Sequence, residues 1–307
     1  MLPFKLVYHE RYDLNLGAHV FPAQKYRLIR QELLQRGIAG EEDFLEPQPA
    51  SREQLLLVHT ADWIQKLERG RLSYQEVLKL EIPYSRRMVE GVFLAAGGTL
   101  LAARRALADG AGFNIGGGFH HAFPDHGEGF CAVHDVAVAV RVLQREGLVK
   151  KVLIVDVDVH HGNGTAGIFG SDPDVFTLSI HHFNNYPAVK PPSAIDIHLE
   201  DGAGDAEYLA RLRPACEAAV LGFRPEIVFY VAGVDPYEDD QLGGLSLSKE
   251  GLHERDRLVF GLALRKHVPV VVTLAGGYAR STLDTVDLHV QTVMALNESM
   301  KEWARRW

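Results

Sequence analysis

The chain contains 307 residues, of which 47% are hydrophobic and 23% are charged, and its formal net charge is -8. This composition is typical of a folded globular protein and excludes a disordered or fibrous chain. The sequence contains no basic stripe and no patch of interleaved basic and aromatic residues, so direct nucleic-acid binding is not expected.

The chain also lacks the sequence signals of export and of membrane insertion. Its start, MLPFKLVYHE, has no basic region followed by a long apolar segment, and no later segment reaches the ~20 apolar residues of a membrane span. Cys131 and Cys216 are too few for a disulfide framework and lack the spacing of metal ligands. We therefore expect a cytoplasmic protein that makes no membrane contact, with both cysteines reduced in the core.

Alternating apolar and amphipathic segments predict the fold class. Apolar segments bounded by turn residues predict strands, in chain order, at residues 111–115, 151–159, 175–180, 226–233 and 268–277. Helical patterns occupy Ser85–Asp109, His134–Glu146, Asp205–Leu221, Lys249–Lys266 and Ser281–Leu296, and Glu46–Glu53 is predicted to be a surface loop. The alternation predicts one α/β domain over residues 1–307: an open, mostly parallel sheet with helices on both faces.

Unusual polar segments directly follow four of the predicted strands. They read GGGFHHAF (116–123), HHGNGT (160–165), GVDPYEDD (233–240) and GGYARS (276–281). In an open parallel sheet, ligands bind at the carboxyl ends of the strands. We therefore expect the four segments to form one site at that edge.

The segment LIVDVDVHHGNGT, residues 153–165, suggests a metal site. Asp156, Asp158 and His160 alternate with valines, so on a strand they would share one face. Ionised carboxylates are costly to bury without a partner, which indicates a cation nearby. Together with Asp235 from a distant strand end, Asp158 and His160 supply three ligands and leave a position open, as in catalytic zinc sites.

The other polar residues of these segments suggest hydrolysis at that metal. His120 and His121 could take a proton from a water that the metal activates and return one to a leaving amine. Asp156 could accept a hydrogen bond from one imidazole and Asn163 from the other. Tyr278 could donate a hydrogen bond to a polarised carbonyl.

These motifs resemble one family. FNIGGGFHHAF, VDVDVHHGNGT, AGVDPYEDDQLGGLSLS and LAGGYA are similar, in order and over most of the chain, to the zinc-dependent histone deacetylase superfamily, and GEGFCAVHDVAVAV is most like its class IV branch and the bacterial relatives. The resemblance implies an arginase-like α/β fold and zinc on Asp158, His160 and Asp235. It also implies that His120 and His121 are the general base and acid and that Tyr278 polarises the acyl carbonyl.

The resemblance further implies a substrate channel and a second cation. Phe130 and Tyr186 would form the channel walls around an acyl-lysine stem, and Gly129 and Gly276 would bring backbone close to it. A structural potassium ion would lie near Asp156, with Ser179 and backbone carbonyls beside it.

Some positions depart from the family pattern or are only loosely aligned with it. Asn163 stands where many class I enzymes have an aspartate. Glu81 would be a carboxylate at the channel rim, and Leu242 aligns with the acidic gatekeeper of polyamine-specific relatives. His181 and His182 are expected to be structural residues behind the channel wall.

We expect a zinc-dependent hydrolase that removes acetyl or longer acyl groups from the ε-amine of lysine in proteins or peptides. An acetylpolyamine amidohydrolase is the alternative, favoured by the acidic residues of YEDD. A non-catalytic acyl-lysine-binding module and a binuclear manganese ureohydrolase fit the residues less well. The sequence leaves open iron(II) in place of zinc and the oligomeric state.

Overall fold

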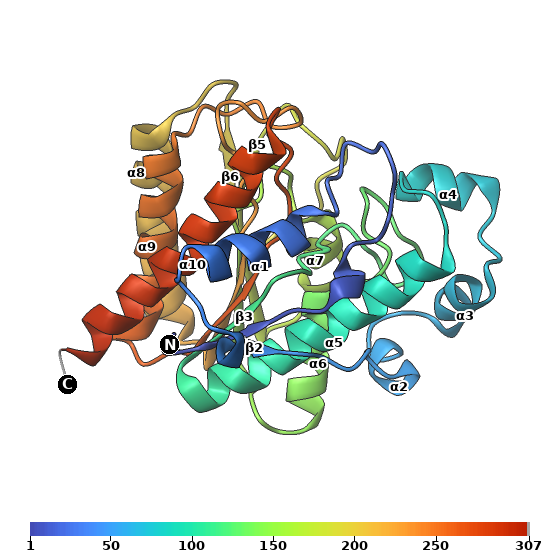
Figure 1. The fold of residues 1–307 in the computed structure, drawn as a ribbon, viewed down its shortest axis with the longest axis horizontal. Coiled ribbons are helices and arrows are strands. Elements are labelled where there is room, and N and C mark those ends of the chain that lie inside the picture. The colour runs from blue at the N-terminus through green and yellow to red at the C-terminus, as the bar shows by residue number, and fades with distance from the viewer. Residues whose placement is uncertain (306–307) are drawn as a thin grey trace.

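The structure, a computed structural model that describes residues 1–305, is built on a single parallel sheet of eight strands (Figure 1). The strand order is β2-β1-β3-β8-β7-β4-β5-β6, and every neighbouring pair is parallel. The strands are β1 Lys5–Val7, β2 Phe44–Leu45, β3 Ala111–Asn114, β4 Val152–Asp156, β5 Val175–His182, β6 Ile195–Leu199, β7 Ile227–Val231 and β8 Val270–Thr273.

All five predicted strands are present, and they form the centre of the sheet. Strands β3, β4, β7 and β8 are buried at every position, because helices cover both of their faces. The strands that sequence reasoning missed, β1, β2 and β6, have two to five residues, and both edges of the sheet, β2 and β6, are among them. Their partial exposure removes the continuous apolar pattern by which the central strands were predicted.

Helices flank the sheet on both sides (Figure 1). The α-helices are α1 Lys25–Gln35, α2 Arg52–Leu55, α3 Ala61–Arg69, α4 Tyr74–Leu80, α5 Arg86–Asp109, α6 Asp135–Arg145, α7 Asn163–Phe169, α8 Asp205–Ala218, α9 Lys249–Arg265 and α10 Thr282–Ala304. A π-helical turn, Ala219–Phe223, continues α8, and 3-10 turns lie at Glu10–Tyr12 and Glu41–Asp43. Helices α1, α10, α9 and α8 pack in a row, and α5 packs on α6.

The five predicted helices are α5, α6, α8, α9 and α10, and their starts are set by capping side chains at several points. The Ser85 hydroxyl accepts a hydrogen bond from Met88 N at the start of α5, and the Ser248 hydroxyl accepts one from Gly251 N at the start of α9. Helix α10 extends beyond the predicted end at Leu296, to Ala304. The predicted loop 46–53 is correct up to Ser51, which caps α2.

Strand β4 ends earlier than the sequence pattern indicates. The prediction that Asp156, Asp158 and His160 share one face of a strand is wrong, because β4 ends at Asp156 and the other two residues lie in the loop that follows. The Asp156 carboxylate accepts a hydrogen bond from Asp158 N, 3.2 Å away, which ties this loop to the strand end. The loop still directs all three side chains toward the same end of the sheet.

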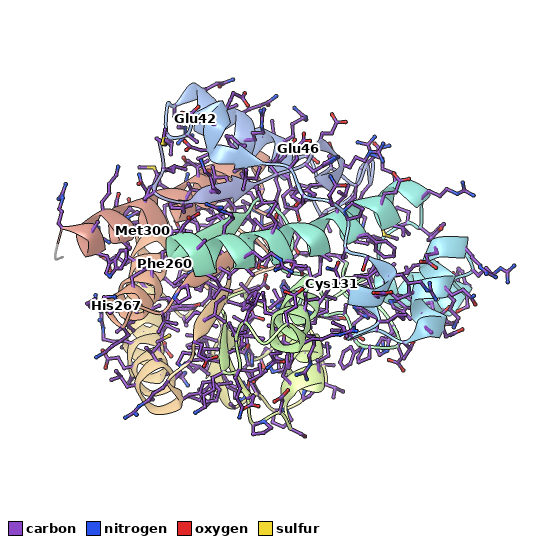
Figure 2. All side chains as sticks on the ribbon, turned by 90° about the horizontal axis from the view of Figure 1, so that it is seen from below. Glu42, Glu46, Cys131, Phe260, His267 and Met300 are labelled. Carbon is purple, nitrogen blue, oxygen red and sulfur yellow. The ribbon has the colours of Figure 1, made fainter. Side chains whose placement is uncertain are left out.

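The core fills both layers between sheet and helices. Figure 2 labels two of its side chains, Phe260 on α9 and Met300 on α10, and both are buried. Cys131 and Cys216 are buried free thiols, as predicted. By length and composition alone, α5 could cross a membrane, contrary to the prediction that no segment is long and apolar enough, but 67% of its most apolar 18-residue stretch is buried inside the protein.

Candidate metal centre and active site

The carboxyl ends of four adjacent strands bring the predicted site residues together. The order β3-β8-β7-β4 places these strands side by side, so the segments that follow them meet at one edge of the sheet. His120 and His121 follow β3, Tyr278 follows β8, Asp235 follows β7, and Asp158 follows β4.

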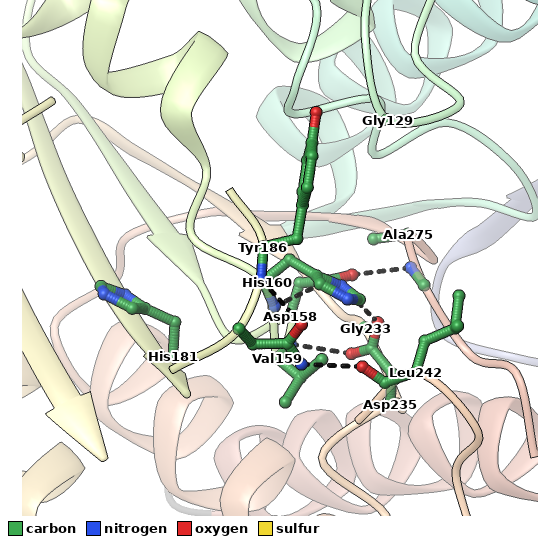
Figure 3. A network of polar contacts seen from close by, with 12 residues as sticks. Gly129, Asp158, Val159, His160, His181, Tyr186, Gly233, Asp235, Leu242 and Ala275 are labelled. Carbon is green, nitrogen blue, oxygen red and sulfur yellow. Dashed lines mark hydrogen bonds and ion pairs between the residues drawn. The ribbon is translucent and has the colours of Figure 1, made fainter. Parts of the chain in front are cut away.

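Asp158, His160 and Asp235 form a candidate metal centre (Figure 3). Each offers one ligand atom, these atoms lie within 4.8 Å of one another, and all three side chains are buried. The Nδ1 atom of His160 is 2.9 Å from Asp158 Oδ1 and 3.3 Å from Asp235 Oδ2. Backbone N–H groups of Gly276 and Val159 each donate a 2.8 Å hydrogen bond to the second oxygen of Asp158 and Asp235, respectively, and so orient both carboxylates.

The donor set fits a divalent cation. Asp235 Oδ2 is buried and accepts no hydrogen bond of good geometry from residues 1–305, and its ion-pair partner, His160 Nδ1, is 3.3 Å away. Burial and the charge of Asp158 raise the pKa of Asp235 to about 6, and a bound cation would oppose both effects. Two carboxylates and one imidazole are ligands that zinc accepts.

His120 and His121 lie beside this centre, each with one ring nitrogen already engaged. The ring centroids are 4.0 Å apart. His120 Nδ1 is 2.7 Å from Asp156 Oδ2, and His121 Nδ1 is 2.7 Å from Asn163 Oδ1. The structure therefore places Asp156 beside one imidazole and Asn163 beside the other, as the sequence suggested.

The two imidazoles have opposite electrostatic environments. Burial alone would lower the pKa of His120, but the carboxylates of Asp156 and Asp158 raise it to about 9. Burial and the neighbouring His120 hold the pKa of His121 well below its ordinary value. Without a bound cation, His120 is thus charged and His121 is neutral near pH 7.

Tyr278 completes the inner site. Its ring lies edge-on to His160, with centroids 6.3 Å apart, and it also contacts the rings of Phe21 and Phe130. The backbone N–H of Tyr278 donates a 2.6 Å hydrogen bond to Asp240, which holds the loop after β8 in place.

A channel of about 210 Å³ leads from the surface to Tyr278 and the metal centre. Its walls include the predicted channel residues Gly129, Phe130, Tyr186, Glu81 and Leu242. The remaining one, Gly276, lines a smaller pocket of about 20 Å³ at the inner end.

Two glycines permit close approach of the backbone to this site. Gly129 has φ of +51°, and a Cβ atom there would lie 2.7 Å from the His121 ring and 2.9 Å from the Tyr186 ring. A Cβ atom at Gly276 would lie 2.6 Å from Asp158 Oδ2. Side chains at either position would displace the residues that the channel and the metal centre require.

The structure places the residues predicted for potassium side by side. Asp156 on β4 is in register with Ser179 on β5. The Ser179 hydroxyl is 2.9 Å from His181 Nδ1, and both Asp156 oxygens are engaged within the site. A potassium ion at this place stays a prediction.

His161, His181 and Asp196 form a second group with converging ligand atoms. His161 Nε2 is 3.2 Å from Asp196 Oδ1, and His181 Nε2 is 2.8 Å from His198 Nδ1. Hydrogen bonds thus join His161 to Asp196 and His181 to His198, and the rings of His161 and His181 pack edge to face with centroids 4.6 Å apart. This agrees with the structural role predicted for His181, and His182 is likewise engaged, 2.6 Å from Asp201.

The comparisons with known proteins identify the family. Residues 19–294 match the model of the histone deacetylase domain. The chain belongs to the histone deacetylase family. All the predicted site residues, from Glu81 to Tyr278, lie within the matched residues.

The relatives of this histone deacetylase-family chain span most of its length. It is 40% identical to an uncharacterised protein of Picosynechococcus sp., over 93% of this chain and 96% of that protein. It is 31% identical to histone deacetylase 2 of Arabidopsis thaliana, over 90% and 75% of the two chains. The crystal structure of the HDA15 HD domain superposes with a TM-score of 0.79 at 26% identity, covering 95% of this chain and 87% of that one.

Together these comparisons confirm the predicted family and fold class, and the family makes the chain a hydrolase of amide bonds. Assignment to the class IV branch stays a prediction.

Sequence reasoning missed two charged residues of this deacetylase-family site. Lys25 of α1 is fully buried, donates a 2.7 Å hydrogen bond to Ala275 O, and lies 5.8 Å from the centre of the Tyr278 ring. Glu128 is buried next to Asn163. A lysine in an amphipathic helix gives no sequence signal of burial. Glu128 could have been found, because it lies between two glycines, Gly127 and Gly129, just before the predicted channel residue Phe130.

Proposed function

We propose that this protein is a zinc-dependent lysine deacylase, which hydrolyses the amide between an acetyl group and the ε-amine of lysine in a protein or peptide. The observation that carries the proposal is the placement of Asp158, His160 and Asp235 at the inner end of a channel walled by Phe130 and Tyr186. A lysine stem is an unbranched apolar chain, so a narrow aromatic channel suits it. The channel would present the terminal amide to the metal centre.

Asp158, His160 and Asp235 would hold the zinc ion. Bound zinc supplies a Lewis acid that polarises the substrate carbonyl and lowers the pKa of water. The backbone bonds from Gly276 and Val159 keep the two carboxylates oriented for that task.

The histidine pair would move the protons. The Nδ1 atoms of both rings are engaged with Asp156 and Asn163, so the Nε2 atoms face the reaction. One imidazole takes a proton as water adds to the acyl carbon, and a proton passes to the amine as the C–N bond breaks. The products are a carboxylate and the free lysine side chain.

Tyr278 would stabilise the charge that develops on the acyl oxygen. Its hydroxyl is a donor, and its ring lies at the boundary between the channel and the inner pocket. A hydrogen bond that forms only as the carbonyl oxygen becomes negative accelerates the reaction without strengthening substrate binding.

The mouth of the channel favours a peptide substrate over a polyamine. Of the acidic residues in YEDD, Glu238 is exposed, Asp239 pairs with Arg280, and Asp240 accepts hydrogen bonds from Tyr278 N and Leu242 N. None of the three is among the described residues that line the channel, whose mouth carries Leu242 where a cation-binding acid would be needed. Glu81 lies at the same mouth and can accept hydrogen bonds from the backbone N–H groups of a peptide.

The test compares peptides carrying acetyl-lysine with N-acetylputrescine and N-acetylspermidine, with and without a chelator and added zinc. We expect chelator-sensitive release of acetate from the peptides, and loss of both zinc and activity in Asp158→Ala. Glu81→Ala should raise KM for the peptides about tenfold while leaving the small amines unaffected. Turnover confined to the small amines, or none with zinc bound, would refute the proposal.

A further inference from the structure

Glu128 is a buried carboxylate directly behind the partner of His121. It lies in a tight hairpin in which Glu128 N donates to Cys131 O and Cys131 N donates to Glu128 O, at 3.2 and 2.9 Å. The residue is 7% exposed. The same hairpin carries Gly129 and Phe130 into the channel wall, so the backbone that builds the channel also fixes this carboxylate.

Glu128 is held by donors from several segments. Its Oε1 accepts a short hydrogen bond from Asn163 Nδ2 and one of 3.3 Å from the Tyr186 hydroxyl. Its Oε2 lies 2.9 Å from Lys79 Nζ and 3.4 Å from His126 Nε2. Burial opposes ionisation, yet the hydrogen bonds from Lys79 and Asn163 lower the pKa of Glu128, so it is a charged acceptor near pH 7.

These contacts determine which way the Asn163 amide faces. A carboxylate accepts hydrogen bonds only, so Asn163 must turn its NH₂ group toward Glu128. The Asn163 carbonyl oxygen then faces His121, 2.7 Å from Nδ1. A carbonyl oxygen also only accepts, so His121 must carry its proton on Nδ1 and keep a lone pair on Nε2.

An asparagine beside a histidine does not impose this arrangement by itself. A rotation of about 180° of the amide would place NH₂ against the imidazole at almost no steric cost, and the opposite tautomer would then be favoured. Asp156 has no such ambiguity, because both of its oxygens are acceptors for His120.

We propose that Glu128 is a positioning residue for His121: it locks the Asn163 amide so that His121 is the Nδ1–H tautomer, with Nε2 free to accept a proton. Asp156 accepts the hydrogen bond from His120 Nδ1 directly. Glu128 has the corresponding effect on His121, because it turns the Asn163 carbonyl oxygen toward His121 Nδ1. The inference rests on the proposed function for its catalytic consequence, but the tautomer itself is a property of the resting protein.

The first test reads the tautomer without turnover. In two-bond ¹H–¹⁵N spectra of histidine-labelled protein, with His121→Gln identifying the signals, we expect a protonated Nδ1 and an unprotonated Nε2 for His121. Glu128→Ala should shift these signals toward a mixture of the two tautomers. Unchanged His121 signals in Glu128→Ala would overturn the proposal.

The second test exchanges the hydrogen-bond donor and acceptor between positions 128 and 163. Glu128→Ala should lower kcat for the acetyl-lysine peptide at least about tenfold, with little change in KM or zinc content. Asn163→Asp should be impaired as well, because it sets two carboxylates against each other. In the double variant Glu128→Gln with Asn163→Asp, the glutamine amide donates to the carboxylate introduced at position 163, and kcat should recover to within about threefold of the wild type.

A carboxylate far from the site provides the control. Asp172 is partly buried and pairs with Arg141 on another surface, so Asp172→Asn should leave kcat unchanged. If kcat of the double variant is no higher than that of Asn163→Asp, the proposed role of Glu128 is wrong, even when the wild type is active. A wild type that is inactive on every substrate refutes the proposed function, whereas the histidine spectra still decide the tautomer.

Discussion

At the inner end of the channel, the close polar neighbour of each buried histidine ring decides whether that ring is protonated. His120 faces a carboxylate and His121 faces an amide, so burial has opposite outcomes for two adjacent imidazoles. Asp235 has a buried oxygen to which no described residue donates a hydrogen bond. Three carboxylates, those of Asp156, Asp158 and Asp235, gather at this end of the channel, and this concentration of negative charge favours the binding of a metal ion.

Tyr278→Phe tests the hydroxyl at this scale. The ring contacts with Phe21 and Phe130 would persist, so we expect bound zinc and KM to change little while kcat falls by about 10²–10³. Steady-state kinetics and metal analysis of the purified variant measure both quantities. Tyr84→Phe, which removes a hydroxyl bonded to Leu67 O, should retain full activity; equal kcat in Tyr278→Phe would remove Tyr278 from the mechanism.

At the scale of elements, loops rather than strands carry the chemistry. Strand β4 is the clearest example, because only Asp156 of its three polar residues lies in the strand. Long-range hydrogen bonds hold these loops in place. His59, after α2, accepts a 3.0 Å hydrogen bond from His134 N at the start of α6 and has its other ring nitrogen 3.1 Å from Phe123 O.

His59 makes the stability of this junction depend on pH. Burial, partly opposed by backbone hydrogen bonds, lowers its pKa from 6.5 to about 4. Between these values the unfolded chain binds more protons than the folded one, so the free energy of unfolding falls as the pH falls. We expect His59 to account for a loss of about 2 kcal/mol between pH 7.5 and 5.

Urea unfolding of the wild type and of His59→Gln at several pH values checks this. The free energy of unfolding of the variant should be lower than that of the wild type at pH 7.5. At pH 5 the difference between the two should be smaller by about 2 kcal/mol. Curves that run parallel over this range would show that His59 does not titrate as its burial implies.

At the scale of the whole molecule, the N-terminal segment closes the inner end of the channel. Phe21 and Tyr26 of this segment line the inner pocket together with Gly276 and Tyr278. The pocket measures about 20 Å³, which is room for about one water molecule. An acetyl methyl group fits such a space, and a long acyl chain does not.

We therefore expect acetyl-lysine peptides to be hydrolysed with a kcat/KM at least about tenfold higher than that of octanoyl- or myristoyl-lysine peptides. Phe21→Ala should enlarge the pocket and raise the ratio of octanoyl to acetyl turnover. A wild type that prefers the long chains would show that the N-terminal segment moves away from the inner pocket.

The sequence alone predicted the central strands and the helices α5, α6, α8, α9 and α10, and it singled out the candidate metal ligands and the histidine pair. This was possible because buried parallel strands are continuously apolar and polar residues at their ends stand out. The short strands β1, β2 and β6 and the helices α1 to α4 and α7 escaped prediction because their patterns are brief or partly exposed.

Only the tertiary structure decided which residues stand behind those in the motifs. Lys25 reaches Ala275 across 250 positions, and Glu128 reaches Asn163 across 35. Such contacts depend on how loops from different strands pack, and a buried charge has no local pattern that distinguishes it from an exposed one. The sequence therefore identified the chemical groups of the site, whereas packing decided their charges, their orientation and the space left for the acyl group.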